Sequence, residues 1–150
     1  MHRILAAVDL SDSTQPVLQY SAELARVEHA SLAVVHAIQA TAPISAVAWN
    51  GGVSLMPSPE DEQAEFESSL GLLHQIVEST GLANIDCMCE RGSAARTIRD
   101  MAERLHADLI VLGSHGHGRF FHTMFGSVRE AVLSHAPCPV LVVPSEANPS

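Results

Sequence analysis

The residues that could hold a phosphate group gather in one segment late in the chain. Four glycines fall within 14 residues, at 113, 116, 118 and 126, and Ser127 follows the last of them. Glycine allows positive φ and a close approach of the backbone to a ligand. The pattern leads into a predicted helix, whose first turn offers free N–H groups. The segment 113–127 therefore predicts a phosphate site, although a glycine-rich turn that binds nothing can have the same spacing.

The chain contains no lysine, and this absence excludes two classes of protein. All eight of its Lys plus Arg residues are arginine. A Walker-type phosphate loop requires its lysine, and so does an enzyme that forms a Schiff base with its substrate or with pyridoxal phosphate. Backbone N–H groups, arginine, histidine, hydroxyl groups or a metal ion must therefore hold any bound anion.

Arginine and histidine side chains near the glycine segment are the charged candidates. Arg119 and, one turn into the next helix, Arg129 are candidate phosphate contacts, and either could instead be a solvated surface residue. His115 is a candidate nucleotide contact. The spacing of His115, His117 and His122 does not match a structural zinc site. We therefore expect no dedicated metal site, while Mg²⁺ could be carried by the phosphates without a protein cage.

Charge, length and cysteine count narrow the functional class. A formal net charge of −9 argues against a general basic surface for nucleic acid and against attachment to an anionic membrane. The apolar run Ile4–Val8 is too short for a secretory signal, and no long apolar segment follows. The odd count of three cysteines predicts no disulfide framework and fits a reducing compartment. We expect a cytoplasmic protein.

Strand and helix signals alternate along the whole chain and predict the scaffold that positions these residues. Apolar or alternating runs are typical of strands in a covered parallel sheet, and they occupy residues 4–8, 32–38, 85–89, 109–112 and 139–143. Capping residues and helical spacing predict helices between them, at about 13–29, 59–80, 93–105 and 126–135. The acid-rich start of the second helix, 60–67, predicts a solvated face. Such alternation predicts one α/β domain over 1–150, with helices on both faces of a parallel sheet.

Two segments fall outside this pattern. Residues 41–57, rich in Ala, Ser, Gly and Pro, predict a long loop of the kind that often forms a lid or binding element. Residues 146–150 predict a flexible tail. Ligands of open parallel sheets bind at the carboxyl ends of the strands, where Asp9 follows the first strand. Asp9 could meet a ribose hydroxyl or could cap its own turn.

Four stretches of the chain match one known pattern in their order. Gly113, Gly116, Gly126 and Ser127 form the spacing G-x2-G-x9-G-S. The other matching stretches are the first strand with its terminal Asp9, residues 107–116, and the final unit over 126–128 and 137–143. In type and order they resemble the ATP-binding branch of the universal stress protein (UspA-like) family, and this similarity covers essentially the whole chain.

This resemblance implies a fold, a ligand and a set of contacts. The implied fold is a single Rossmann-like domain of the adenine nucleotide α-hydrolase type, a three-layer sandwich around a five-stranded parallel sheet in the order 3-2-1-4-5. The implied function is a nucleotide-dependent stress-response or regulatory protein that binds ATP. The implied nucleotide-binding residues are Ala7, Val8, Asp9, Ala37, Leu112, Gly113, His115, Gly116, Arg119, Gly126, Ser127 and Val128.

The resemblance also implies the part that each contact plays. Gly113 and Gly116 would lie against ribose and phosphates, and Gly126 with Ser127 would receive the phosphate tail. The main chain of Ala37 would bind the adenine edge. Many relatives carry Arg or Lys directly after the second glycine, whereas this chain has His117-Gly118 before Arg119. AMP or cyclic AMP therefore remains an alternative to ATP.

Catalysis and assembly stay open at the level of sequence. The chain has no G-x-S-x-G nucleophile elbow, and we assign no catalytic residue, although a water near His115 or His117 could hydrolyse ATP slowly. A related α-hydrolase is disfavoured because the segment after the first strand, 9–13, lacks the expected glycines. The resemblance implies a homodimer, for which Pro139–Val143 would be a sheet edge open to pairing, and an unidentified protein partner.

Overall fold

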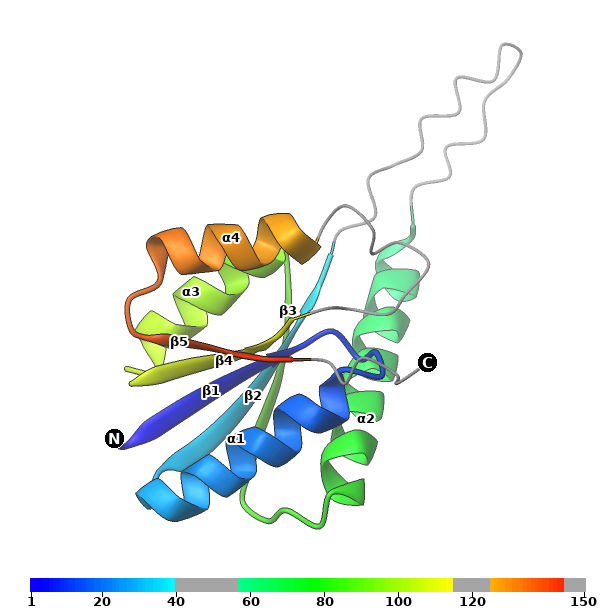
Figure 1. The fold of residues 1–150 in the computed structure, drawn as a ribbon. Helices are drawn as coiled ribbons and strands as arrows, with labels where there is room; N and C mark the ends of the chain where they lie inside the picture. Colours follow the sequence, from blue (N-terminus) through cyan, green and yellow to red (C-terminus); the bar gives the residue numbers. More distant parts are fainter. Residues whose placement is uncertain (40–56, 115–124, 145–150) are drawn as a thin grey trace, which may run out of the picture.

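A computed structural model describes residues 1–39, 57–114 and 125–144 as a three-layer α/β sandwich (Figure 1). All strand pairs are parallel, and the five-stranded sheet has the order β3-β2-β1-β4-β5. Its strands are β1 Arg3–Val8, β2 Ser31–Ile38, β3 Asp86–Arg91, β4 Leu109–Gly113 and β5 Val140–Val143. Its helices are α1 Thr14–Glu28, α2 Pro59–Ser79, α3 Ala94–Arg104 and α4 Phe125–His135. The predicted fold class and strand order are confirmed.

Two predicted segments cannot be compared with the structure. The long loop over 41–57 lies outside the described residues apart from Pro57, and so does the tail over 146–150. Within the described part of the chain, no helix combines the length and the apolar character that crossing a membrane requires.

Strand alternation divides the apolar residues between two cores, one on each face of the sheet. Ile4, Ala6 and Val8 of β1 pack in the core under α1 and α2, with α1 supplying Leu18. The intervening residues of β1 pack in the second core, under α3 and α4. Burial on both faces explains why β1 is a continuous apolar run rather than an alternating one.

The strand order changes direction beside β1. From β1 the chain moves outward through β2 to β3, and then crosses back to β4 on the other side of β1. The connections after β1 and β4 therefore diverge at the carboxyl edge of the sheet, which is where open α/β sheets bind ligands.

Local capping fixes where α2 begins. The Ser58 hydroxyl accepts a hydrogen bond from the Asp61 N–H at 3.1 Å, and the Asp61 carboxylate accepts one from the Ser58 N–H at 3.0 Å. Pro59 occupies the first helical turn. The Ser58 N–H and the Ser58 hydroxyl both donate to the Asp61 carboxylate and lower its pKa, because they favour its charged form. The helix start predicted from Ser58-Pro59-Glu60-Asp61 has the reciprocal geometry of a capping box.

Candidate functional site

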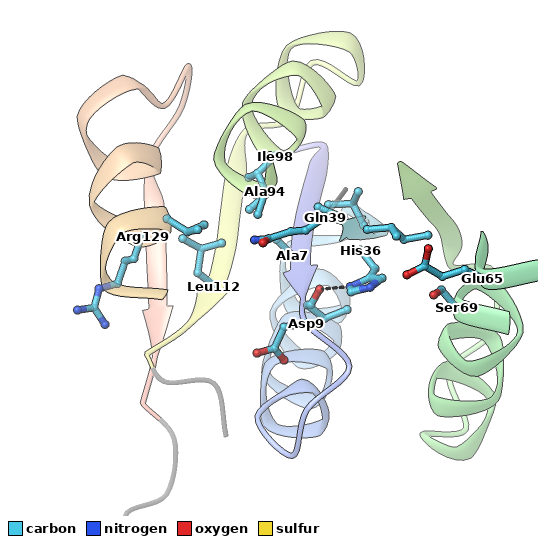
Figure 2. Close-up of a pocket in the computed structure, with 15 residues that line it drawn as sticks. Ala7, Asp9, His36, Gln39, Glu65, Ser69, Ala94, Ile98, Leu112 and Arg129 are labelled. Atoms are coloured by element: carbon cyan, nitrogen blue, oxygen red, sulfur yellow. Dashed lines mark hydrogen bonds between the residues drawn. The ribbon is translucent and has the colours of Figure 1, made fainter. Parts of the chain in front are cut away.

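A cavity of about 320 Å³ opens at the carboxyl edge of the sheet (Figure 2). Its volume lies at the lower end of the range of small-ligand sites. The ends of β1, β2 and β4 form its floor, and α2, α3 and α4 supply its walls. The lining residues are Ala7, Val8, Asp9, Val35, His36, Ala37, Ile38, Gln39, Glu65, Ser69, Ala94, Ile98, Leu112, Val128 and Arg129.

Half of the predicted nucleotide-binding residues lie in this cavity. The six that line it are Ala7, Val8, Asp9, Ala37, Leu112 and Val128. Ser127 lies in an adjoining hollow that shares Gln39, Ala94 and Val128 with the cavity. The structure thus brings together residues from β1, β2, β4 and α4 that are more than 100 positions apart in sequence.

The other predicted residues fall into two groups. His115, Gly116 and Arg119 lie outside the described residues. Gly126 belongs to the first turn of α4. Gly113 ends β4, and a Cβ added to it would lie 3.4 Å from both Ser13 Oγ and Val17 Cγ2. These are ordinary van der Waals distances, so packing against α1 does not by itself require glycine at 113. The predicted ligand contact of Gly113 stays a prediction.

The two carboxylate oxygens of Asp9 differ in their hydrogen bonding. Oδ1 accepts hydrogen bonds from the Ser11 N–H at 2.9 Å and the Ser11 hydroxyl at 2.5 Å, with Ser13 Oγ and Thr14 Oγ1 at 3.5 Å. Oδ2 is buried and accepts no hydrogen bond from any residue in the described ranges. Leu10 holds this turn at a φ of 62°, a left-handed conformation that costs about 1–2 kcal/mol for a non-glycine residue. The turn thus fixes the carboxylate and leaves Oδ2 for a hydroxyl donor.

His36 is a lining residue that the sequence did not single out. It pairs with Val8 in the β1–β2 register, and its Nδ1 lies 2.9 Å from the Val8 carbonyl oxygen. Since a carbonyl oxygen only accepts, Nδ1 carries the proton, and in the neutral ring Nε2 is then an acceptor. The available signal in the sequence was a polar residue two positions before the carboxyl end of an otherwise apolar run. The contact itself depends on strand register, which the sequence does not contain.

Glu65 and Ser69 enter the site from α2 (Figure 2). Glu65 Oε2 forms an ion pair with Arg91 at 3.2 Å, and Arg91 also donates to the carbonyl oxygen of Glu62. The side chain of Glu65 is 47% exposed. The predicted solvated face of α2 is therefore partly a wall of the cavity, because the end of β3 brings Arg91 against it.

Arg129 joins α4 to the start of the glycine segment. Its guanidinium donates a 2.6 Å hydrogen bond to the carbonyl oxygen of Ser114, the residue after β4. In Figure 2 the guanidinium points away from the other labelled residues, so the stem rather than the charge faces the cavity. Arg129 thus holds the end of β4.

The described ranges contain no group of three or more His, Cys, Asp or Glu residues that could hold a metal ion.

The cysteines lie away from the cavity. Cys87 and Cys89 lie on β3, and burial raises the pKa of both thiols, with nearby acids adding to the effect on Cys87. Burial also raises the pKa of the Cys138 thiol. A thiol with a raised pKa is a poor nucleophile, and all three are free. They therefore serve as small apolar side chains: Cys89 lies in the core under α1 and α2, and Cys87 and Cys138 pack against the two cores.

Comparison with known proteins finds relatives over nearly the whole chain. A model described as "Universal stress protein family" matches residues 1–144. The chain is 34% identical over 140 residues to the universal stress protein A homolog 1 of Coxiella burnetii, covering 93% of this chain and 94% of that protein.

Two solved structures have a similar fold. The universal stress protein UspA from Lactobacillus plantarum is 25% identical, with a TM-score of 0.67 over 95% of this chain and 97% of its own. A universal stress protein from Archaeoglobus fulgidus, solved in complex with dAMP, is 26% identical, with a TM-score of 0.58 over 95% of this chain and 97% of its own. The sequence and structure comparisons thus point to the same group of proteins.

Proposed function

The chain belongs to the universal stress protein family, and from this premise we propose that it binds ATP in the cavity at the carboxyl edge of the sheet. One observation carries the proposal: the buried Oδ2 of Asp9, a lining residue, lacks a hydrogen-bond donor among the described residues. A buried acceptor without a donor is costly. A ribose hydroxyl would supply that donor, and the related Archaeoglobus fulgidus protein in complex with dAMP supports an adenine nucleotide as the ligand class.

The cavity offers a different environment for each part of the nucleotide. The base would lie at the end of β2, where Ala37 lines the cavity, with the apolar side chains of Ile98 and Leu112 against the ring faces. The main chain of Ala37 would bind the edge of the base. Asp9 would hold the ribose. The phosphates would extend toward Gly126 and Ser127, because the first turn of α4 carries a partial positive charge.

The phosphate charge must be balanced without lysine. Arg119 and the glycine segment 113–127, of which residues 115–124 lie outside the described residues, are our proposed phosphate contacts. Mg²⁺ would share the charge with the phosphates. Arg129 would act indirectly, because its hydrogen bond to Ser114 fixes the residue from which the glycine segment departs.

We further propose that nucleotide occupancy regulates assembly. In the described sheet, β5 is an edge strand paired only with β4, and an uncovered edge can pair with another chain. The glycine segment that would hold the phosphates begins at Gly113, the last residue of β4, which pairs with Val143 at the end of β5. Bound nucleotide would thus bias homodimer formation or the binding of a protein partner, and assembly would in turn change nucleotide affinity by the same factor.

The proposal is tested by identifying the nucleotide and removing its ribose contact. The purified protein is denatured and any released nucleotide identified by mass, and ATP, AMP and cyclic AMP are titrated calorimetrically. Asp9→Asn should weaken ATP binding about 10- to 100-fold, because it removes a hydrogen bond to a charged acceptor. Asp12→Asn is the matched control, since Asp12 is an exposed neighbour outside the cavity. Absence of any released nucleotide together with no measurable affinity would overturn the proposal.

A nucleoside monophosphate is the second candidate ligand. The Archaeoglobus fulgidus relative was solved with dAMP, and the His117-Gly118 pair departs from the pattern of many ATP-binding relatives. Tighter binding of AMP or cyclic AMP than of ATP in the same titration would favour a sensor of those nucleotides. Single-turnover measurements with His115→Ala and His117→Ala variants would show whether slow ATP hydrolysis accompanies binding.

A further inference from the structure

Three helices of the described fold begin after a serine, and Ser13 is the one that is buried without capping its helix. Ser58 accepts a hydrogen bond from the Asp61 N–H at the start of α2. Ser13 occupies the corresponding position of α1, but its side chain makes no such bond. Ser93, before α3, makes none either and is exposed, whereas Ser13 is 7% exposed. A serine in this position usually stabilises its helix, so the contacts of the Ser13 hydroxyl need another explanation.

The Ser13 hydroxyl is directed back toward the turn that follows β1. Its Oγ lies 2.9 Å from Ser11 Oγ, and the Ser11 hydroxyl donates to Asp9 Oδ1 at 2.5 Å. Because a hydroxyl has one proton and Ser11 gives its proton to the carboxylate, Ser13 is the donor to Ser11. Ser13 Oγ is also 3.5 Å from Asp9 Oδ1, which is long for a direct hydrogen bond. The hydrogen bonds thus run in one direction, from Ser13 through Ser11 to Asp9.

This chain of hydrogen bonds fixes which oxygen of Asp9 stays available. Ser11 Oγ accepts from both the hydroxyl and the N–H of Ser13, the latter at 3.3 Å, so its own proton is directed to Asp9. Successive hydrogen bonds of this kind polarise and strengthen one another. Oδ1 is thereby held, while Oδ2 has no donor among the described residues. Ser13 therefore orients a carboxylate of the cavity through an intermediate residue.

Ser13 also lies beside the start of the glycine segment. A Cβ built on Gly113 would lie 3.4 Å from Ser13 Oγ and 3.6 Å from Ser13 Cβ. Ser13 itself is not among the residues that line the cavity. It is thus placed behind two parts of the candidate site, the turn that carries Asp9 and the end of β4.

We propose that Ser13 is a positioning residue for sugar recognition, which acts through Ser11 to hold the Asp9 carboxylate with Oδ2 toward a sugar hydroxyl. This inference rests on the proposed nucleotide binding and assigns a role to a residue that does not touch the nucleotide. Without the Ser13 hydroxyl, the Ser11 hydroxyl loses the donor that orients it and is free to turn away from Oδ1. The carboxylate then rotates, and Oδ2 accepts the sugar hydroxyl less well.

ATP and 2′,3′-dideoxy-ATP form the test pair, because they share base and phosphates and differ only in the sugar hydroxyls. Wild-type protein should bind ATP at least about tenfold more tightly in calorimetric titrations, since sites built to hydrogen-bond a hydroxyl reject analogues that lack it. Ser13→Ala should lower this affinity ratio several-fold. A general loss of folded protein would weaken both nucleotides equally, so the ratio reports on the carboxylate rather than on folding.

Ser58→Ala is the matched control, since it removes a serine that does cap its helix and lies outside the cavity. It should lower thermal stability and leave the ratio unchanged. Ser13→Ala should lower the ratio with a smaller loss of thermal stability, because no cap hydrogen bond is removed. Ser13→Cys keeps most of the side-chain volume but offers only a weak S–H donor. It should lower the ratio as Ser13→Ala does, which excludes an empty space at position 13 as the cause.

The direction of the hydrogen bonds predicts how the two serines combine. Ser11→Ala removes the direct hydroxyl donor to Oδ1 and should lower the ratio more than Ser13→Ala does. The double variant should resemble Ser11→Ala alone, because Ser13 acts on Asp9 through Ser11 and substitutions within one network are not additive.

The outcomes distinguish this inference from the proposed function. Equal binding of ATP and 2′,3′-dideoxy-ATP by the wild-type protein would overturn the inference and leave ATP binding intact. A wild-type ratio that survives in both Ser13→Ala and Ser13→Cys would also overturn it, and so would fully additive losses in the double variant. Absence of binding to either nucleotide would instead overturn the proposed function.

Discussion

Ser21 is a single buried hydroxyl whose removal should stabilise the protein. It lies on α1, is 0% exposed, and its Oγ has no hydrogen-bond partner among the described residues. Burying an unpaired polar group costs about 1–3 kcal/mol, and alanine is also the better helix former. Ser21→Ala should therefore raise the free energy of unfolding by about 1–2 kcal/mol, measured by urea denaturation.

An exposed serine provides the comparison for Ser21. Ser134 lies on α4 and its hydroxyl donates a 2.8 Å hydrogen bond to the Glu130 carbonyl oxygen. Ser134→Ala should change the free energy of unfolding by less than about 0.5 kcal/mol, as is usual for surface substitutions. If Ser21→Ala proved destabilising, the Ser21 hydroxyl would have to be hydrogen-bonded in solution.

From the residues alone, without the family resemblance, the site was best predictable where a strand ends. Asp9 and Ala37 follow from the rule that ligands bind at the carboxyl ends of parallel strands, and both line the cavity. Glu65 and Ser69 were not predictable in this way, because α2 reaches the cavity through its packing on β3 and β2. The unpaired Oδ2 of Asp9 was equally beyond the sequence, since it depends on how the turn through Leu10 orients the carboxylate.

At the scale of elements, Asp108 ties the starts of β1 and β4 together. Its Oδ2 accepts hydrogen bonds from the His2 N–H at 2.6 Å and the Arg3 N–H at 2.9 Å. The Asp108 N–H in turn donates to the Arg3 carbonyl oxygen at 2.8 Å. The two backbone hydrogen bonds lower the pKa of Asp108, because they favour its charged form.

This contact predicts a loss of stability in acid. The carboxyl pKa is lower in the folded state than its unfolded value of about 3.9, so the stabilisation is present above that value and disappears as the pH falls through the folded pKa. Urea denaturation should find the wild-type protein more stable than Asp108→Asn near neutral pH, with the difference shrinking below about pH 4. Asp12→Asn, which changes an exposed carboxylate, should show a smaller pH-dependent difference. A difference for Asp108→Asn that does not vary with pH would contradict the prediction.

The order and type of the elements were predictable, and their ends were less so. Every predicted strand and helix is present, because burial on both faces leaves continuous apolar runs that sequence patterns detect. Pro139 was included in the last strand, but β5 begins at Val140. Proline has no N–H for the strand ladder, although the Pro139 carbonyl still accepts from the Ile110 N–H at 3.0 Å. Such ends are set by individual hydrogen bonds rather than by pattern.

At the scale of the whole molecule, the edge strand β5 is the surface through which the proposed homodimer would form. The carbonyl oxygens of Pro139 and Val143 accept hydrogen bonds from β4 and the residue after it. Since backbone groups alternate sides along a strand, those of Val140 and Val142 point toward the outer edge. The proposed homodimer would use these outward groups.

Val142→Pro tests that geometry because it removes one outward N–H and leaves the bonding of β5 to β4 intact. Proline is tolerated on edge strands where the N–H faces outward, so the monomer should stay folded. Sedimentation equilibrium should find the wild-type protein dimeric and Val142→Pro largely monomeric. Val142→Ala is the matched control, because it shortens the side chain and keeps the N–H, and it should remain dimeric. A dimer that persists in Val142→Pro would place the interface away from the β5 edge, while a monomeric wild-type protein would rule out the homodimer itself.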